Sequence, residues 1–248
     1  AKSRPELSEV GAVVRACMIA ETAGTPVNLL GISTIRSLGE ITRARGKNKG
    51  VFAETSPQYL LLDEAAYSAP EGARLLCDPP LRAGREKAML WGAAGGGQLM
   101  AVSSDHFGWP AAQRTSEDFR ELPAGLPGVG TLASLVWSFG VRENKFSAER
   151  MCGLLSENPA RLFGLFPRKG VLAEGADADI VVWDDAWRCD SDEEKPGFAA
   201  YGFTPYAGME LGGRPRAVFL AGELAAENGR VLRAGGGKFA PEAEPQVR

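Results

Sequence analysis

The chain of 248 residues carries 28 Lys and Arg against 31 Asp and Glu, a formal net charge of −3, and 44% of its residues are apolar. Such a chain can bury the core of one large domain or of one and a half small ones, and it lacks the electrostatic footprint of a protein that binds nucleic acid or an anionic membrane. No segment approaches the roughly 20 apolar residues of a membrane span and no signal peptide opens the chain, so the composition predicts a cytoplasmic protein.

The four cysteines lie far apart and form no C-x-x-C pair: Cys17, Cys77, Cys152 and Cys189. This spacing argues against a disulfide framework or a zinc knuckle, and we expect buried thiols. The chain opens at Ala1 without an initiator Met, so we expect a fragment, a processed chain or a partial reading frame. Ser3 and Glu6 flank Pro5 in the pattern of a helix capping box.

The first part of the chain alternates helical and strand patterns. Apolar residues recur at helical spacing or in short runs, and glycines punctuate them. We expect helices at 7–23, 33–45 and 85–94 and strands at 27–32, 51–54 and 99–103. Strands that alternate with helices of 10 to 15 residues indicate parallel βαβ units, and three such units make an arc and not a closed barrel.

The character of the chain changes after residue 105. Residues 107–130 are rich in Pro and Gly and are typical of a long ordered loop beside a site. Helices are expected at 131–139 and at 148–155, the second capped by Ser147. Strand patterns at 178–183 and 217–220 predict a small sheet domain, and the Gly-rich end at 235–248 predicts a tail.

Asp105 is the most informative candidate residue, because it follows the apolar strand that ends at Ser103, where β/α barrels carry their chemistry. A carboxylate there can bind a metal or accept a proton from water. The alternative is that Asp105 only caps the following loop. His106 is the one histidine of the chain, and a lone histidine is more often a hydrogen-bonded structural residue than a catalyst.

A series of short motifs resembles the dihydropyrimidinases and hydantoinases, which are cyclic amidohydrolases with allantoinases as close relatives. The motifs occur in the order of that family, and their succession is specific although no single one decides. They lie at 51–60, 79–82, 104–106, 125–128, 158–165, 167–170, 175–179 and 204–210.

The resemblance implies a C-terminal part of a TIM-type (β/α)8 barrel, holding strands 6–8, followed by part of a small β-sandwich. We therefore expect three regions: barrel at 1–170, sandwich at 171–234 and tail at 235–248. In this family two metal ions, usually zinc, are bridged by a carboxylated lysine, and metal-bound hydroxide attacks the ring amide. The resemblance makes Asp105 the aspartate that both binds metal and moves the proton. The other ligands of the family are the two histidines of an H-x-H motif, the lysine and two further histidines. The resemblance places all of these except the last histidine, on the sixth strand, in a half that this chain does not contain.

The chain departs from the family pattern at three site positions. Gly31 stands where the family has a metal-binding histidine, in Gly-Ile-Ser in place of His-Val-Ser, and glycine has no side chain to bind a metal. Asp78 replaces a serine and Ala124 an asparagine, both at positions that bind the substrate ring. Those contacts run largely through main chain, so these two changes weaken the resemblance less than Gly31 does.

Two functions remain open at this point. One is part of an enzyme that hydrolyses the C–N bond of a small cyclic amide or ureide. It is inactive as this chain alone and active in full length or joined to an N-terminal chain, and its expected partner is a homo-oligomer or the N-terminal half. The other is a non-catalytic homologue that acts as an interaction or regulatory protein. Gly31 favours the second, whereas Asp105 and the loop at 125–128 favour the first.

Overall fold

The computed structural model describes residues 2–116, 118–196, 198–241, 243 and 245–246. Two compact units divide the chain. The first contains residues 1–132 and 190–209, and the second contains residues 133–189 and 210–248. The division predicted from the sequence places its boundary elsewhere, at residue 170, and it stays a prediction.

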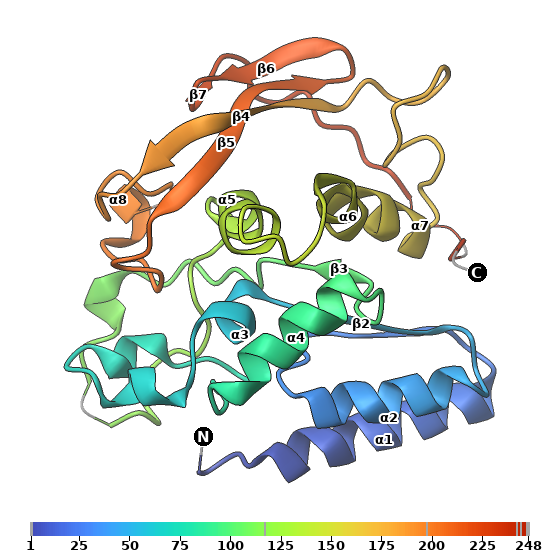
Figure 1. The fold of residues 1–248 in the computed structure, drawn as a ribbon, viewed down its shortest axis with the longest axis vertical. Coiled ribbons are helices and arrows are strands. Elements are labelled where there is room, and N and C mark those ends of the chain that lie inside the picture. The colour runs from blue at the N-terminus through green and yellow to red at the C-terminus, as the bar shows by residue number, and fades with distance from the viewer. Residues whose placement is uncertain (1, 117, 197, 242, 244, 247–248) are drawn as a thin grey trace. The chain divides into compact units, whose positions relative to one another are not determined.

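The first unit is built on a parallel sheet in the order β1-β2-β3, formed by Val27–Leu29, Val51–Thr55 and Ala101–Val102. α1 (Glu6–Ala23) precedes β1, α2 (Ile35–Arg45) connects β1 to β2, and α4 (Arg85–Gly95) leads into β3. Figure 1 shows α1 and α2 side by side in this unit. The predicted arc of three strand–helix units is present, and the barrel is not closed.

The middle strand explains why this unit folds. β2 buries Val51, Phe52, Ala53 and Thr55, and only Glu54 retains partial exposure. A strand covered on both faces reads as a continuous apolar run, as expected for a parallel sheet. Leu38 and Ile41 of α2 are fully buried as well.

Helix ends follow the local chemistry of the chain. Gly24 ends α1 in the left-handed conformation, with φ of 62°, where glycine is favoured because it has no Cβ. Thr34 caps α2 by accepting a hydrogen bond from the Ser37 N–H. The predicted capping box at the start of α1 is wrong: Pro5 is the N-cap residue and no side chain caps this helix.

Between β2 and α4 the first unit holds α3 (Pro57–Leu61) and two short 3-10 turns, Glu64–Ser68 and Gly72–Leu75. The loop after β3 contains a 3-10 turn at Ala111–Gln113, and α8 (Phe198–Tyr201) completes this unit.

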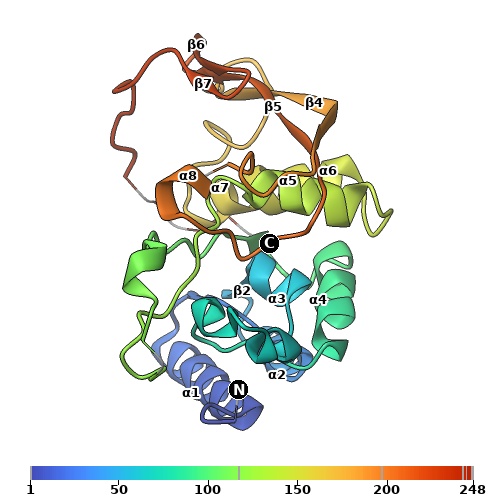
Figure 2. The same ribbon diagram turned by 90° about the vertical axis from the view of Figure 1, so that its left-hand side faces the viewer.

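The second unit combines helices with an antiparallel sheet. α5 (Leu132–Val136) continues into a π-helical turn at Trp137–Val141. α6 (Ala148–Cys152) follows Ser147, which accepts a hydrogen bond from the Arg150 N–H as predicted, and leads through a second π-helical turn at Gly153–Glu157 into α7 (Asn158–Leu162). The sheet has the order β4-β5-β6-β7, formed by Ile180–Cys189, Leu211–Leu220, Glu223–Glu227 and Arg230–Val231 (Figure 2).

The sheet packs on the helices through aromatic rings, with the Trp137 and Trp183 centroids 5.4 Å apart. The C-terminal residues of the second unit contact α7, because Ala243 N–H donates to Phe163 O and Gln246 N–H donates to Arg161 O. Three of the four cysteines are buried as expected, but Cys152 on α6 is exposed. None of the helices in the described part of the chain is long and apolar enough to cross a membrane.

Candidate functional site

Asp105 lies just beyond β3 with φ of 44°, in the left-handed region that L-residues rarely adopt. Its Oδ2 accepts a hydrogen bond of 2.8 Å from the side-chain amide of Gln58, which is only 1% exposed. Gln58 belongs to α3, directly after β2, so neighbouring strand ends bring the two side chains together.

The charge state of Asp105 follows from this environment. Burial raises the pKa of its carboxyl above the ordinary value, the hydrogen bond from Gln58 lowers it, and the charge of Glu54 raises it. Asp105 in turn contributes, after burial, to raising the pKa values of Tyr59, Cys77 and Tyr206. Asp105 is thus a half-buried carboxylate among neutral acids, an environment suited to accepting a proton.

A polar row crosses the same sheet beside Asp105. Glu54 Oε1 accepts a hydrogen bond of 2.7 Å from Ser103 Oγ, and Glu54 Oε2 accepts one of 3.0 Å from Asn28 Nδ2. Glu54 belongs to β2 and Asn28 to β1, and Ser103 directly follows β3, so the row connects all three strands. Glu54 and Gln58 lie inside a motif recognised in the sequence, but their roles were missed because no residue pattern shows which side chains meet across a sheet.

Gly31 lies two residues beyond β1 and has φ of 63°. A Cβ at this position would lie 3.4 Å from Pro79 Cδ and 3.9 Å from Tyr59 Cε2, both ordinary van der Waals distances. There is therefore room for a Cβ atom, but the backbone conformation disfavours one.

Asp78 and Ala124 both line one cavity of about 770 Å³, which we call the Cys77 cavity because Cys77 also lines it. Asp78 forms an ion pair with Arg4, and both side chains are more than half exposed. Asp105 does not line this cavity, although its charge influences Cys77. The structure therefore brings the two predicted substrate-binding residues together in one cavity, which the predicted catalytic residue does not line.

His106 is held by the surrounding loops. Its Nδ1 accepts hydrogen bonds from the Gly128 and Val129 N–H groups at 3.1 and 3.3 Å, so Nε2 carries the proton and donates to Tyr201 Oη at 3.1 Å. Both ring nitrogens are used in structural contacts, in agreement with a structural role for this histidine.

The donor set around Asp105 does not fit a metal site by itself. Among the residues described, no three His, Cys, Asp or Glu side chains gather closely enough to hold a metal ion. A hydrolytic zinc site normally takes three protein ligands, and Gly31 supplies none.

Comparison with known proteins identifies the family. Residues 14–225 match the model of the amidohydrolase family. The chain belongs to this family. It is 35% identical over 239 residues to a D-hydantoinase of Rhizobium radiobacter, an alignment that covers 94% of this chain and 52% of that protein. It is 41% identical over 188 residues to a D-phenylhydantoinase of Escherichia coli O1:K1 / APEC, covering 74% of this chain and 41% of that protein.

Solved structures agree with these relatives. The dihydropyrimidinase from Brevibacillus agri NCHU1002 superimposes with a TM-score of 0.91 at 32% identity, over 100% of this chain and 55% of that one. The chain spans about half the length of the curated relatives it matches. It is therefore an α/β amidohydrolase relative that corresponds to part of the hydantoinase fold, and the family to which it belongs is metal-dependent.

Proposed function

We propose that this chain is the C-terminal part of a hydantoinase-like or dihydropyrimidinase-like enzyme that hydrolyses a ring amide C–N bond. Residues 1–170 supply strands 6–8 of a (β/α)8 barrel, residues 171–234 part of a β-sandwich, and residues 235–248 a tail. The observation that carries this proposal is Asp105 at the end of β3, half-buried and oriented by Gln58. Carboxyl ends of barrel strands are where such enzymes hold catalytic groups.

In this proposal Asp105 accepts the proton of the attacking water and returns it to the ring nitrogen as the C–N bond breaks. A general base works best when its pKa lies near the working pH, and burial moves the Asp105 pKa in that direction. Asp78 and Ala124, which line the Cys77 cavity, contribute main-chain contacts to the substrate ring.

The metal ions expected from the family, two zinc ions, do not fit the residues present, because no three potential ligands gather around Asp105 in the described part of the chain. We propose that the remaining ligands come from an N-terminal half of the protein, supplied as a further chain or segment. β1 and β3 are the two outer strands of the three-stranded sheet, so further parallel strands can add at either edge.

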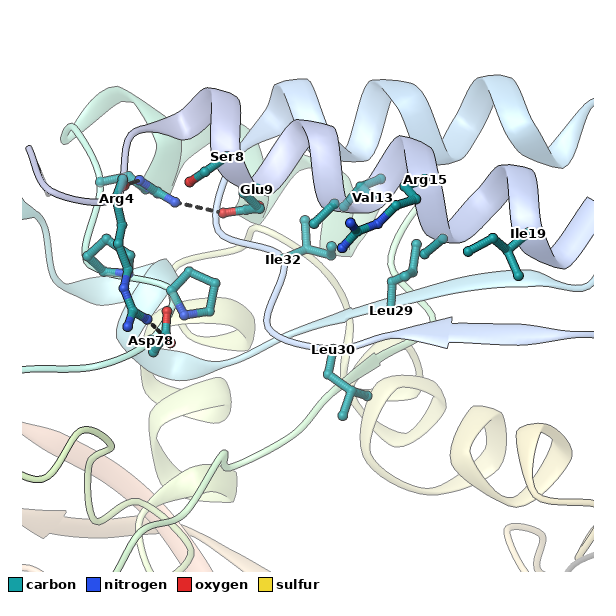
Figure 3. A pocket seen from close by; sticks show the side chains of 15 residues that line it. Arg4, Ser8, Glu9, Val13, Arg15, Ile19, Leu29, Leu30, Ile32 and Asp78 are labelled. Carbon is teal, nitrogen blue, oxygen red and sulfur yellow. Dashed lines mark hydrogen bonds and ion pairs between the residues drawn. The ribbon is translucent and has the colours of Figure 1, made fainter.

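The groove beside β1 fits this partner. A cavity of about 590 Å³ runs between α1 and the end of β1. Figure 3 shows Leu29 and Ile32 pointing toward α1, where Val13 and Ile19 lie, while Leu30 points away from the helix. Leu30 is 68% exposed and Ile19 61%, and parallel sheets bury both faces, so this edge is suited to a further βα unit.

A non-catalytic role is the second candidate, and Gly31 supports it. If Gly31 marks a lost ligand in the whole protein, the fold and its contacts would serve an interaction or regulatory function. Zinc content of the completed protein separates the two: an enzyme retains a stoichiometric metal site, and a scaffold does not.

The test measures hydrolysis of hydantoin and dihydrouracil by the chain alone and by the chain combined with its N-terminal half. We expect no turnover from the chain alone, because one ligand does not make a hydrolytic site. We expect turnover from the combination, lost in Asp105→Asn and kept in Asp185→Asn, which removes an exposed carboxylate of β4. Turnover by the chain alone that disappears in Asp105→Asn would refute the requirement for a second half, and a combination that is inactive and metal-free would refute the enzyme.

A further inference from the structure

The Cys77 cavity combines an apolar interior with basic groups. Its apolar lining comes from two segments that are distant in sequence: Leu76 and Pro80 from one, and Phe119 and Leu122 from the other. Its volume of about 770 Å³ lies within the range of small-molecule sites. Ala124 adds little bulk to the wall, so the space beside it stays open.

The charges that line this cavity are mainly positive. Lys2, Arg4 and Arg120 line it, and Asp78 is the one carboxylate among the lining residues. The Arg4–Asp78 ion pair cancels one of these charges. Arg120 also forms an ion pair with Asp118, but this pair is exposed, and exposed ion pairs contribute little to stability. Three basic side chains and one carboxylate thus line the cavity, in a chain whose net charge is −3, and the exposed Arg120–Asp118 pair leaves the Arg120 guanidinium accessible to a ligand carboxylate.

The walls of the cavity are fixed by hydrogen bonds, among them those of a buried arginine. The guanidinium of Arg114 is 2% exposed and donates to the main-chain oxygens of Arg74 and Gly125. The Gly125 N–H donates to Leu76 O at 3.0 Å, which ties the two wall segments directly. Trp109 Nε1 donates to Ala124 O at 3.2 Å. A preformed cavity binds its ligand without a cost for ordering its walls.

We propose that the Cys77 cavity binds the carboxylate-bearing side arm of the ring substrate, so that the enzyme acts on cyclic amides that carry an acidic substituent. This inference rests on the proposed function, since it names the substrate class of the same site. The apolar walls take the carbon chain of the substituent, and Lys2 and Arg120 bind its carboxylate. Burial raises the pKa of the Cys77 thiol to about 11, so this wall residue is neutral near pH 7 and does not repel an anion.

The test compares two ligands of equal size, hydantoin-5-acetate and hydantoin-5-acetamide, which differ in charge. Their dissociation constants for the chain are measured by ligand-observed NMR. Because a hydrogen bond to a charged group is worth more than one between neutral groups, we expect the acetate to bind about tenfold tighter or more. The double variant Lys2→Gln/Arg120→Gln should remove this preference, and Ala124→Leu should weaken both ligands by filling the cavity.

Arg43→Gln is the matched control, because it removes an exposed cation of α2 that does not line the cavity. Equal binding of acetate and acetamide, or a preference that survives the double variant, would overturn the proposal. The outcome is independent of catalysis, because binding is measured without turnover. A completed protein that hydrolyses hydantoin but shows no acetate preference would reject the acidic substrate class and retain the proposed function. A completed protein that prefers the acetate but hydrolyses neither ligand would retain the binding site and reject the proposed function.

Discussion

Replacing Gly31 by histidine tests whether this position is a vacated metal ligand. The backbone there has φ of 63°, and a left-handed conformation costs an L-residue roughly 1–2 kcal/mol. Histidine tolerates this region better than most side chains. The new Cβ would make only van der Waals contacts, at 3.4 Å from Pro79 Cδ and 3.9 Å from Tyr59 Cε2, so it adds no overpacking. We therefore expect the free energy of unfolding to fall by about 1–2 kcal/mol, or the melting temperature by roughly 2–8 °C.

Gly31→Ala is the matched control, because it introduces the same backbone strain without an imidazole. The melting temperatures of both variants should fall by similar amounts. Bound zinc, measured by elemental analysis after dialysis, should rise only in Gly31→His and only when the N-terminal half is present, because the other ligands come from that half.

Unchanged zinc in the completed Gly31→His protein, together with a lowered melting temperature, would refute the reasoning that a ligand was lost here. A fall in melting temperature much larger for histidine than for alanine would show instead that the imidazole does not fit beside Pro79 and Tyr59. A gain of zinc by the isolated chain would contradict the inferred origin of the remaining ligands.

The remaining predictions concern the edge of the sheet, the buried ion pair and the buried thiol. Leu30→Lys should reduce self-association of the isolated chain in light scattering, because it places a charge next to the free edge of β1. Leu172→Lys, at another exposed leucine, should have no effect, and a sharp monomer peak for the unmodified chain would contradict this prediction. Glu9→Gln should lower the free energy of unfolding in urea by about 3–5 kcal/mol, because it leaves the Arg82 guanidinium buried without its carboxylate, and a loss below about 1 kcal/mol would contradict it. Burial raises the folded-state pKa of Cys77 from 9.0 to about 11, so its contribution to the free energy of unfolding is full below pH 9 and is lost between pH 9 and 11. The free energy of unfolding should therefore fall by about 2–3 kcal/mol over this range, and this fall should be absent in Cys77→Ala. Identical pH profiles of stability for the two proteins would refute the prediction.

Local patterns predicted the elements of the first unit well. The strand at 51–54 and the helix at 33–45 appear as β2 and α2 within two residues, because their apolar residues are buried at the period of each structure. Gly24 and Ser147 end and begin helices as expected. The two π-helical turns were not predicted, since they preserve a helical pattern and change only the hydrogen bonding.

Long-range contacts could not be predicted from the sequence, for a different reason. In the sequence, Glu9 is only one of several polar residues of a helix. In the structure its carboxylate accepts hydrogen bonds from Ser33 and forms an ion pair with Arg82, and the side chains of Glu9 and Arg82 are each only 8% exposed. These partners lie 24 and 73 residues away. Periodicity shows which face of a helix is buried, but not which charged residue that face meets.

The strand containing Gly31 shows how a regular pattern fails near a site. Strict alternation predicts that Leu30 and Ile32 both point away from the side that position 31 faces. Leu30 is instead 68% exposed and Ile32 2% exposed, and Ile32 points toward α1 with Leu29 (Figure 3). The alternation stops because β1 ends at Leu29 and Gly31 turns the backbone into the left-handed region.

The same conformation recurs at Asp105, where it is informative because the residue is not glycine. Holding a non-glycine residue at φ of 44° costs of order 1–3 kcal/mol and persists only when the surroundings fix it. Here the hydrogen bond from the buried Gln58 amide fixes the carboxylate beside the end of β2. A loop cap would not need this strain, since an aspartate can cap from ordinary extended backbone. The turn at Asp105 and the hydrogen bond from Gln58 together hold the carboxylate at the strand end, where the proposed function needs it, although Gly31 beyond β1 has no side chain to complete the site.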